Sequence, residues 1–193
     1  QLSLGLAREG IQIISGMAIG IDGISQMSAL KAGGRSFAVL GSGVDVCYPK
    51  CNRGLYDLLL KNGGVISEYM PGTRPASYNF PRRNRLISAL CDVLIVIEAR
   101  LRSGTFITVD FALEQGKEIM ALPGRVTDPL SVGCNALIGQ GAHPVQCVQD
   151  VMDILETVHV EKRDKPKRIL KKIKGPSVQG KPDVIPALTG DEA

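Results

Sequence analysis

The run Val93-Leu94-Ile95-Val96-Ile97 consists of five consecutive apolar residues, four of which are β-branched. Continuous apolar runs of this length are typical of strands that are buried on both faces of a parallel sheet. Similar runs lie at Ile11 to Ile14, Phe37 to Leu40, Val65 to Ile66 and Ile119 to Leu122, with helix-length segments between them. Strand and helix alternate, so the sequence predicts a doubly wound α/β fold.

Helix boundaries support the same alternation. Asn52 precedes the stripe Leu55, Leu58 and Leu59, Pro81 suits a first helical turn, and Ser103 precedes an amphipathic run. Gly33, Gly63 and Gly116 are candidate helix ends, and a last amphipathic helix is expected over Val148 to Leu155.

Length and composition indicate one domain with a tail. The chain has 193 residues, of which 44% are hydrophobic and 22% charged. No apolar run approaches the roughly 18 residues of a membrane helix, and no signal peptide opens the chain. The five cysteines form no C-x-x-C pair, which favours free thiols in the cytoplasm and no metal site.

The net charge of +4 is concentrated in the tail. Residues 1–160 carry 14 Lys and Arg against 14 Asp and Glu, whereas residues 161–174 hold eight bases and two acids. Residues 156–188 are therefore predicted to be a basic flexible linker after a domain that spans residues 1–155. Residues 189–193 begin with the capping pattern of a further helix, so a truncated C-terminal domain is expected to start there.

The loops after the strands are candidate binding sites, because ligands of such sheets bind beyond the carboxyl ends of the strands. Three of these loops are glycine and serine turns: Ser15-Gly16, Gly41-Ser42-Gly43 and Ser103-Gly104-Thr105. Backbone N–H groups in such turns can bind phosphate, although each turn can equally serve tight strand-to-helix geometry alone. The dinucleotide and P-loop patterns are both absent, so neither NAD nor nucleoside triphosphates are favoured.

The most informative segment is Phe80-Pro81-Arg82-Arg83-Asn84-Arg85, at the start of a predicted helix. Cations at a helix N-terminus are mildly destabilising unless an anion lies opposite, so this segment predicts bound phosphate. Lys50 is a further candidate phosphate contact. Tyr48 and Phe80 either stack on a base or pack inside the protein.

These segments together resemble the DNA-processing protein A (DprA/Smf) family over about residues 1 to 155. The resemblance rests on Ser15 to Asp22, Ala38 to Asp45, Ser67-Glu68-Tyr69, the Phe80 to Arg85 segment, Ser103 to Thr105, and Ala121 to Gly124. It implies a Rossmann-like domain without catalytic activity or cofactor, which binds single-stranded DNA without sequence preference. It further implies cytoplasmic delivery of that DNA to the RecA recombinase during natural transformation in competent cells.

Carried over by position, the DNA-binding residues form one set. They are Ser15, Gly16, Gly41, Ser42, Gly43, Lys50, Phe80, Arg82, Arg83, Asn84, Arg85, Ser103, Gly104, Thr105 and Lys117. The region from Gly133 to Val145 resembles the family's self-association and recombinase-facing surface, which implies a homodimer through this region, and plain core packing is the other interpretation. The family's first strand would precede Gln1, so the sheet is expected to lack a central strand, and the missing C-terminal domain is expected to be a winged helix.

Two alternatives belong to other classes. A nucleotide-processing enzyme of the lysine-decarboxylase-like type would need a glutamate where this chain has Thr108, so its acid is missing. A domain that senses a small nucleotide in the same crevice is the other alternative.

Overall fold

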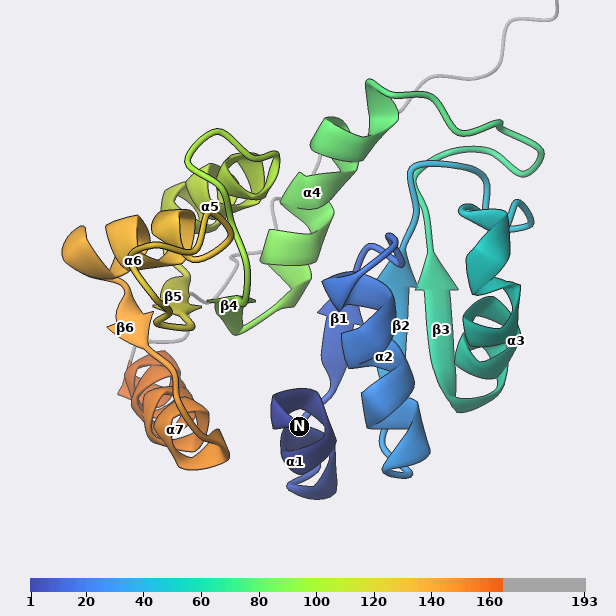
Figure 1. Cartoon of the computed structure of the whole chain (residues 1–193). Coiled ribbons are helices and arrows are strands. Elements are labelled where there is room, and N and C mark those ends of the chain that lie inside the picture. The colour runs from blue at the N-terminus through green and yellow to red at the C-terminus, as the bar shows by residue number, and fades with distance from the viewer. Residues whose placement is uncertain (165–193) are drawn as a thin grey trace, which may run out of the picture.

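The computed structural model describes residues 1–164, and its ribbon is shown in Figure 1. The strands of these residues form two separate three-stranded sheets, of order β1-β2-β3 and β4-β5-β6, and every pairing is parallel. The predicted α/β class with parallel strands is confirmed.

The first half of the fold is built around β2 (Ser36–Val39), which pairs with β1 (Ile13–Ser15) and β3 (Gly63–Ile66). Its helices are α1 (Leu2–Arg8), α2 (Ile21–Lys31) and α3 (Arg53–Asn62), the last preceded by a short 3-10 helix η1 (Lys50–Asn52). The core of this half packs α2 and α3 against β2 through residues that include Leu30, Ala38, Leu40 and Leu59.

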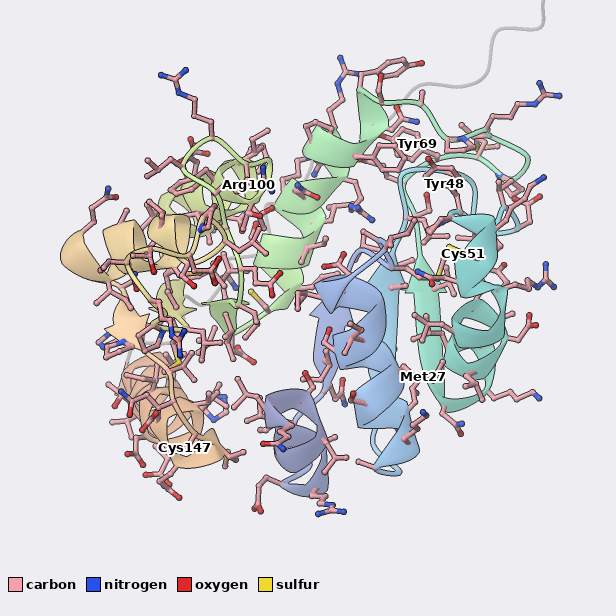
Figure 2. All side chains as sticks on the ribbon, in the orientation of Figure 1. Met27, Tyr48, Cys51, Tyr69, Arg100 and Cys147 are labelled. Atoms are coloured by element: carbon pink, nitrogen blue, oxygen red, sulfur yellow. The ribbon has the colours of Figure 1, made fainter. Side chains whose placement is uncertain are left out.

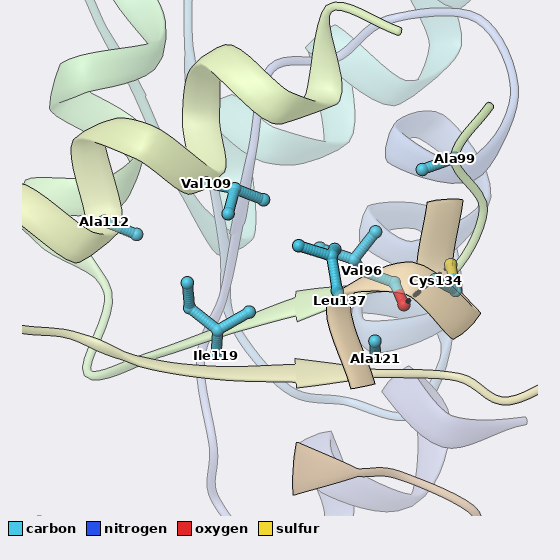
Figure 3. Packing of buried hydrophobic residues seen from close by; sticks show 8 residues of the cluster. All are labelled: Val96, Ala99, Val109, Ala112, Ile119, Ala121, Cys134 and Leu137. Atoms are coloured by element: carbon cyan, nitrogen blue, oxygen red, sulfur yellow. Dashed lines mark hydrogen bonds between the residues drawn. The ribbon is translucent and has the colours of Figure 1, made fainter. Parts of the chain in front are cut away.

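The second half is built around β5 (Glu118–Ala121), which lies between β4 (Val93–Val96) and β6 (His143–Pro144). Its helices are α5 (Thr105–Glu114), α6 (Val132–Gly139) and α7 (Val148–Asp164). Figure 3 shows its core, in which Val96, Val109 and Leu137 meet between the sheet and helices α5 and α6.

Two connections join the halves. Helix α4 (Asn79–Leu90) connects β3 to β4 and lies between the two halves in Figure 1. At the opposite end, Leu6 of α1 shares a core cluster with Val151 and Leu155 of α7. A Cβ on Gly5 would lie 2.5 Å from a methyl group of Val148, so glycine permits the close approach of α1 and α7.

A cleft of about 620 Å³ separates the halves, and its walls include β1 and β4. Neither strand pairs with another strand across this cleft within residues 1–164. The side chains of Ile13, Val93 and Ile95 are accordingly only partly buried, although they are apolar. The opening thus lies between the unpaired edges of β1 and β4.

The predicted strands agree with the structure to within two residues at each end, and α3, α4 and α5 begin near Asn52, Pro81 and Ser103 as predicted. Three features differ. Helix α7 continues to Asp164, beyond the end at Leu155 that the sequence predicts for the last helix. Strand β6 was not predicted, because it has only two residues. Helices α1 and α6 were not predicted, because their short, glycine-containing sequences lack a long apolar stripe. The linker predicted over residues 156–188 begins within α7; its part beyond residue 164 and the predicted start of a further domain lie outside the described residues.

The α3 helix offers a matched test of the first core. Leu59 is completely buried, whereas its neighbour Leu60 is 57% exposed. We expect Leu59→Ala to lower the free energy of unfolding by about 2–5 kcal/mol, because it opens a cavity. Leu60→Ala should change it by about 0.5 kcal/mol or less. Urea unfolding followed by circular dichroism measures both, and equal effects would contradict the described packing of α3.

Candidate nucleic-acid interface

Helix α4 presents two opposite faces because its side chains follow the helical repeat. Asn79, Arg83 and Ile87 are spaced four residues apart and are all buried, whereas Arg82 and Arg85 are exposed. The three arginines of the motif therefore divide between the interior and the surface. The N-terminal end of this helix lies near the carboxyl ends of β1 and β2 (Figure 1), where the sequence predicts the site.

Arg83 is the buried cation of the site, with 5% of its surface exposed. Its Nη1 donates hydrogen bonds to the carbonyl of Gly16, at 3.0 Å, and to the carbonyl of Val39. Burial lowers the pKa of the Arg83 guanidinium, and the nearby Asp22 carboxylate opposes this shift. Arg83 therefore faces the protein interior. A direct DNA contact of Arg83 stays a prediction, and the hydrogen bonds of its guanidinium within the protein indicate a positioning role.

Gly16 and Gly41 make room for side chains of α4. A Cβ on Gly16 would lie 2.5 Å from a guanidinium nitrogen of Arg83, and a Cβ on Gly41 would lie 2.9 Å from the ring of Phe80. Buried Asn79 donates a hydrogen bond to the Gly41 carbonyl at 2.9 Å. These two turns thus require glycine because α4 packs directly on their backbone.

The backbone N–H groups of the turns are largely engaged within the protein. The Asp22 carboxylate accepts hydrogen bonds from the N–H groups of Gly16 and Ala18, at 3.0 and 3.3 Å. The N–H of Gly43 donates to the carbonyl of Thr73 at 2.9 Å, and buried Ser42 donates through its hydroxyl to the carbonyl of Val46. The glycine turns were expected either to bind phosphate or to allow tight strand-to-helix packing. The internal hydrogen bonds of the turns after β1 and β2 favour tight packing.

The exposed cations remain available to an anion, although one has an internal partner. Arg85 forms an ion pair with Glu68 of the loop before α4, and 47% and 31% of the two side chains are exposed. Lys50 and Arg82 are exposed and form no ion pair within the described residues. Asn84, which lies between Arg83 and Arg85 in the motif, accepts a hydrogen bond from the Nε of Arg83.

Aromatic residues lie beside these cations. The rings of Tyr48 and Phe80 stack with their centroids 5.6 Å apart and their planes 25° from parallel. Phe80 is only partly exposed and its ring also lies beside the Arg83 guanidinium, so its contacts here are packing contacts within the protein, and stacking on a base stays a prediction. Figure 2 labels Tyr48 and Tyr69 over the first half, and the hydroxyl of Tyr69 donates to the Asn79 carbonyl at 3.5 Å.

The Ser103-Gly104-Thr105 turn belongs to the second half. Gly104 and Thr105 line the same 620 Å³ cleft as Ser15, Arg83 and Asn84. The Ser103 hydroxyl is buried and has no hydrogen-bond partner within residues 1–164. Arg100 and Arg102 are exposed in the loop that leads to this turn. Figure 2 labels Arg100 over the second half of the fold. Sequence reasoning missed these two arginines, although their position directly after β4 was the signal.

Lys117 lies away from the other candidate residues. Its ammonium group donates hydrogen bonds to the carbonyls of Ala89, at 3.1 Å, and Cys91, at 2.7 Å, at the C-terminal end of α4. Cations are favourable at this end of a helix because they compensate its unpaired carbonyls. The DNA contact of Lys117 stays a prediction, and its ammonium group lies at the opposite end of the helix from Arg82.

Asn79 and Asn52 stabilise the site through side-chain hydrogen bonds, and the sequence did not predict these contacts. Asn52 donates hydrogen bonds to the carbonyls of Met17 and Ala18, which fixes the loop after β1 against α3. Neither position carries a motif that distinguishes it from an ordinary helix-start asparagine.

Arg82 and Arg83 provide a matched pair for testing the buried position. We expect Arg83→Ala to lower the free energy of unfolding by about 2–4 kcal/mol, because the carbonyls of Gly16 and Val39 lose their buried donor. Arg82→Ala should cost about 0.5 kcal/mol or less, since Arg82 is exposed. Urea titration of the two variants measures the difference, and an equal cost would show that Arg83 does not hold the turns.

The fold and its exposed arginines define a Rossmann-like α/β protein with a cationic edge at the carboxyl ends of its strands. The chain belongs to the DNA recombination-mediator protein A family, whose profile matches residues 1–156. This membership confirms the resemblance stated from the motifs.

The chain is similar to the DNA processing protein DprA of Streptococcus pneumoniae, with 47% identity over 148 residues, or 77% of this chain and 52% of that protein. The X-ray structure of the S. pneumoniae protein matches with a TM-score of 0.73 and covers 79% of this chain and 53% of that one. A structure that describes the single-stranded DNA binding mode of DNA processing protein A from Helicobacter pylori matches with the same TM-score of 0.73 at 32% identity, over 81% of this chain and 71% of that one. This chain spans about half the length of the curated relatives it matches first.

No helix within residues 1–164 is long and apolar enough to cross a membrane.

Proposed function

We propose that this chain binds single-stranded DNA by its phosphate backbone, at the edge where α4 meets the turns after β1 and β2. The observation that carries the proposal is the division of the arginine motif. Arg83 is buried and holds the turns, while Arg82 and Arg85 are exposed on the same helix. The single-stranded DNA binding of the H. pylori relative supports it.

The contacts available at this edge favour binding without sequence preference. Arginine and lysine bind phosphate, which positions a strand but carries no information on its bases. We assign the phosphate contacts to Lys50, Arg82 and Arg85, with the Ser103-Gly104-Thr105 turn and its neighbours Arg100 and Arg102 as the continuation on the second half. Gly16, Gly41 and Arg83 act beneath this surface by fixing its shape.

The wider role we propose is delivery of the bound strand to the RecA recombinase in the cytoplasm, during DNA uptake in competent cells. We propose that the region from Gly133 to Val145 mediates self-association and recombinase contact. In this region Gly133, Cys134 and Leu137 pack inside the protein, so the partner surface is formed by exposed neighbours such as His143 and Pro144.

We propose no catalytic activity. Thr108, at the position where the nucleotide-processing alternative needs a carboxylate, lines the large cleft and cannot act as the acid. The small-nucleotide alternative would use the second cleft of about 420 Å³, whose lining includes the carboxylates of Asp22 and Glu98. Arg100 also lines it, so two carboxylates face one guanidinium there, and the excess of negative charge disfavours an anionic nucleotide.

Salt dependence tests the proposed phosphate contacts. We expect the affinity for labelled oligo-dT, measured by fluorescence anisotropy, to fall with salt by a slope of about −0.7 per phosphate engaged. The double variant Arg82→Ala with Arg85→Ala should make this slope about 1.4 smaller in magnitude, because two charges are removed. Binding should weaken alike for all base compositions. Leu60→Ala serves as the control and should change neither the affinity nor its salt slope. A salt-independent wild-type affinity would refute the proposal.

Glu68 competes with DNA for Arg85 if the proposal is correct. Glu68→Gln removes the carboxylate that pairs with Arg85 and should therefore raise the affinity for oligo-dT by about two- to fivefold at low salt. Asp57→Asn, which removes the partner of Arg53 in a similarly exposed ion pair on α3, provides the matched control and should leave the affinity unchanged. Equal effects of the two variants would indicate a general change of net charge rather than the release of Arg85.

A further inference from the structure

The tyrosines of the chain are unevenly distributed over the fold. Three of the four tyrosines, Tyr48, Tyr69 and Tyr78, lie in the loops beside the first turn of α4, and Phe80 lies within that turn. Tyr69 is anchored by its hydroxyl to Asn79, and Tyr48 by its ring to Phe80. The fourth, Tyr56, is buried and donates to the Val44 carbonyl.

Tyr78 has neither kind of anchor. It precedes α4 directly and is 64% exposed, and within residues 1–164 its hydroxyl has no hydrogen-bond partner. Its one ring contact is with Arg82, whose guanidinium carbon lies over the ring at 5.8 Å from the centroid. A guanidinium in this position attracts the electron-rich face of an aromatic ring.

Arg82 can cover only one face of the Tyr78 ring, so the other face contributes to the exposed surface. Tyrosine is amphipathic and usually packs one of its apolar faces, so a ring exposed to this degree is suited to a planar ligand. The four-residue spacing of Tyr78 and Arg82 keeps the ring and the cation together on the exposed face of α4. The pair therefore offers a flat aromatic surface directly beside a positive charge.

We infer that Tyr78 and Arg82 form a base-stacking site, in which one nucleobase packs on the open face of Tyr78 while Arg82 binds the adjacent phosphate. The inference rests on the proposed function and adds a contact to bases that the phosphate contacts lack. Stacking is tolerant of sequence because every base has an aromatic face. The site therefore takes any nucleobase of a single strand, and duplex DNA is excluded because its bases are already stacked on one another.

The experiment compares labelled oligo-dT with an abasic strand of the same length and the same number of phosphates, using fluorescence anisotropy at two salt concentrations. The wild-type chain is expected to bind oligo-dT more tightly than the abasic strand. Tyr78→Ala is expected to weaken oligo-dT binding about fivefold or more, to leave abasic binding unchanged, and to leave the salt slope unchanged. Tyr78→Phe keeps the ring and should stay within about twofold of wild type.

The controls separate stacking from folding and from charge. Leu60→Ala removes an exposed apolar side chain on α3 and should alter neither strand's affinity, and circular dichroism with urea unfolding verifies that Tyr78→Ala is folded. Arg82→Ala should lower the salt slope by about 0.7, unlike Tyr78→Ala. Equal wild-type affinity for the two strands, or an equal loss for both in Tyr78→Ala, overturns the stacking site while the proposed DNA binding stands. Failure of the wild-type chain to bind either strand refutes the proposed function itself.

Discussion

The geometry of the candidate interface depends on the burial of one guanidinium. Arg83 donates to the carbonyls of Gly16 and Val39, which belong to the ends of neighbouring strands, and thereby fixes α4 to the sheet edge. Asn79, one turn earlier, adds a bond to Gly41. A buried cation is stable only when polar groups satisfy its donors, so these carbonyls and α4 constrain one another. Because these bonds fix α4, they also fix the positions of its exposed residues.

The helical repeat of α4 places its buried and its exposed charged residues on different faces. Residues at positions 79, 83 and 87 face inward, which places Arg82 and Arg85 on the exposed surface together with Tyr78. A short segment thus contains an internal link, the two proposed phosphate contacts and, just before it, the proposed stacking residue. The ion pair with Glu68 partly neutralises one of these cations, Arg85. The proposed interface therefore consists of unequal contacts on one helix rather than a uniformly basic patch.

The glycine turns show that one sequence pattern can have more than one physical cause. The turns at Gly16 and Gly41 have the pattern of phosphate-binding loops, and in the structure a side chain of α4 lies where a Cβ of each would be. The Asp22 carboxylate, in the first turn of α2, already accepts the N–H groups that a phosphate after β1 would use. A glycine turn in the sequence indicates that some group lies close to its backbone, but it does not show whether that group is a phosphate or a side chain.

Local sequence patterns are enough to predict the alternation of strand and helix, the family, and the cluster of arginines at the start of α4, because apolar periodicity and short motifs act over a few residues. They do not predict which arginine is buried, that Lys117 caps the far end of α4, or that β1 and β4 lie on the walls of one cleft, all of which are seen in the folded chain. These outcomes depend on contacts between residues far apart in the chain, such as Gly16 and Arg83. Such contacts leave no periodic signal, because burial of a polar group is decided by the partners that folding brings to it.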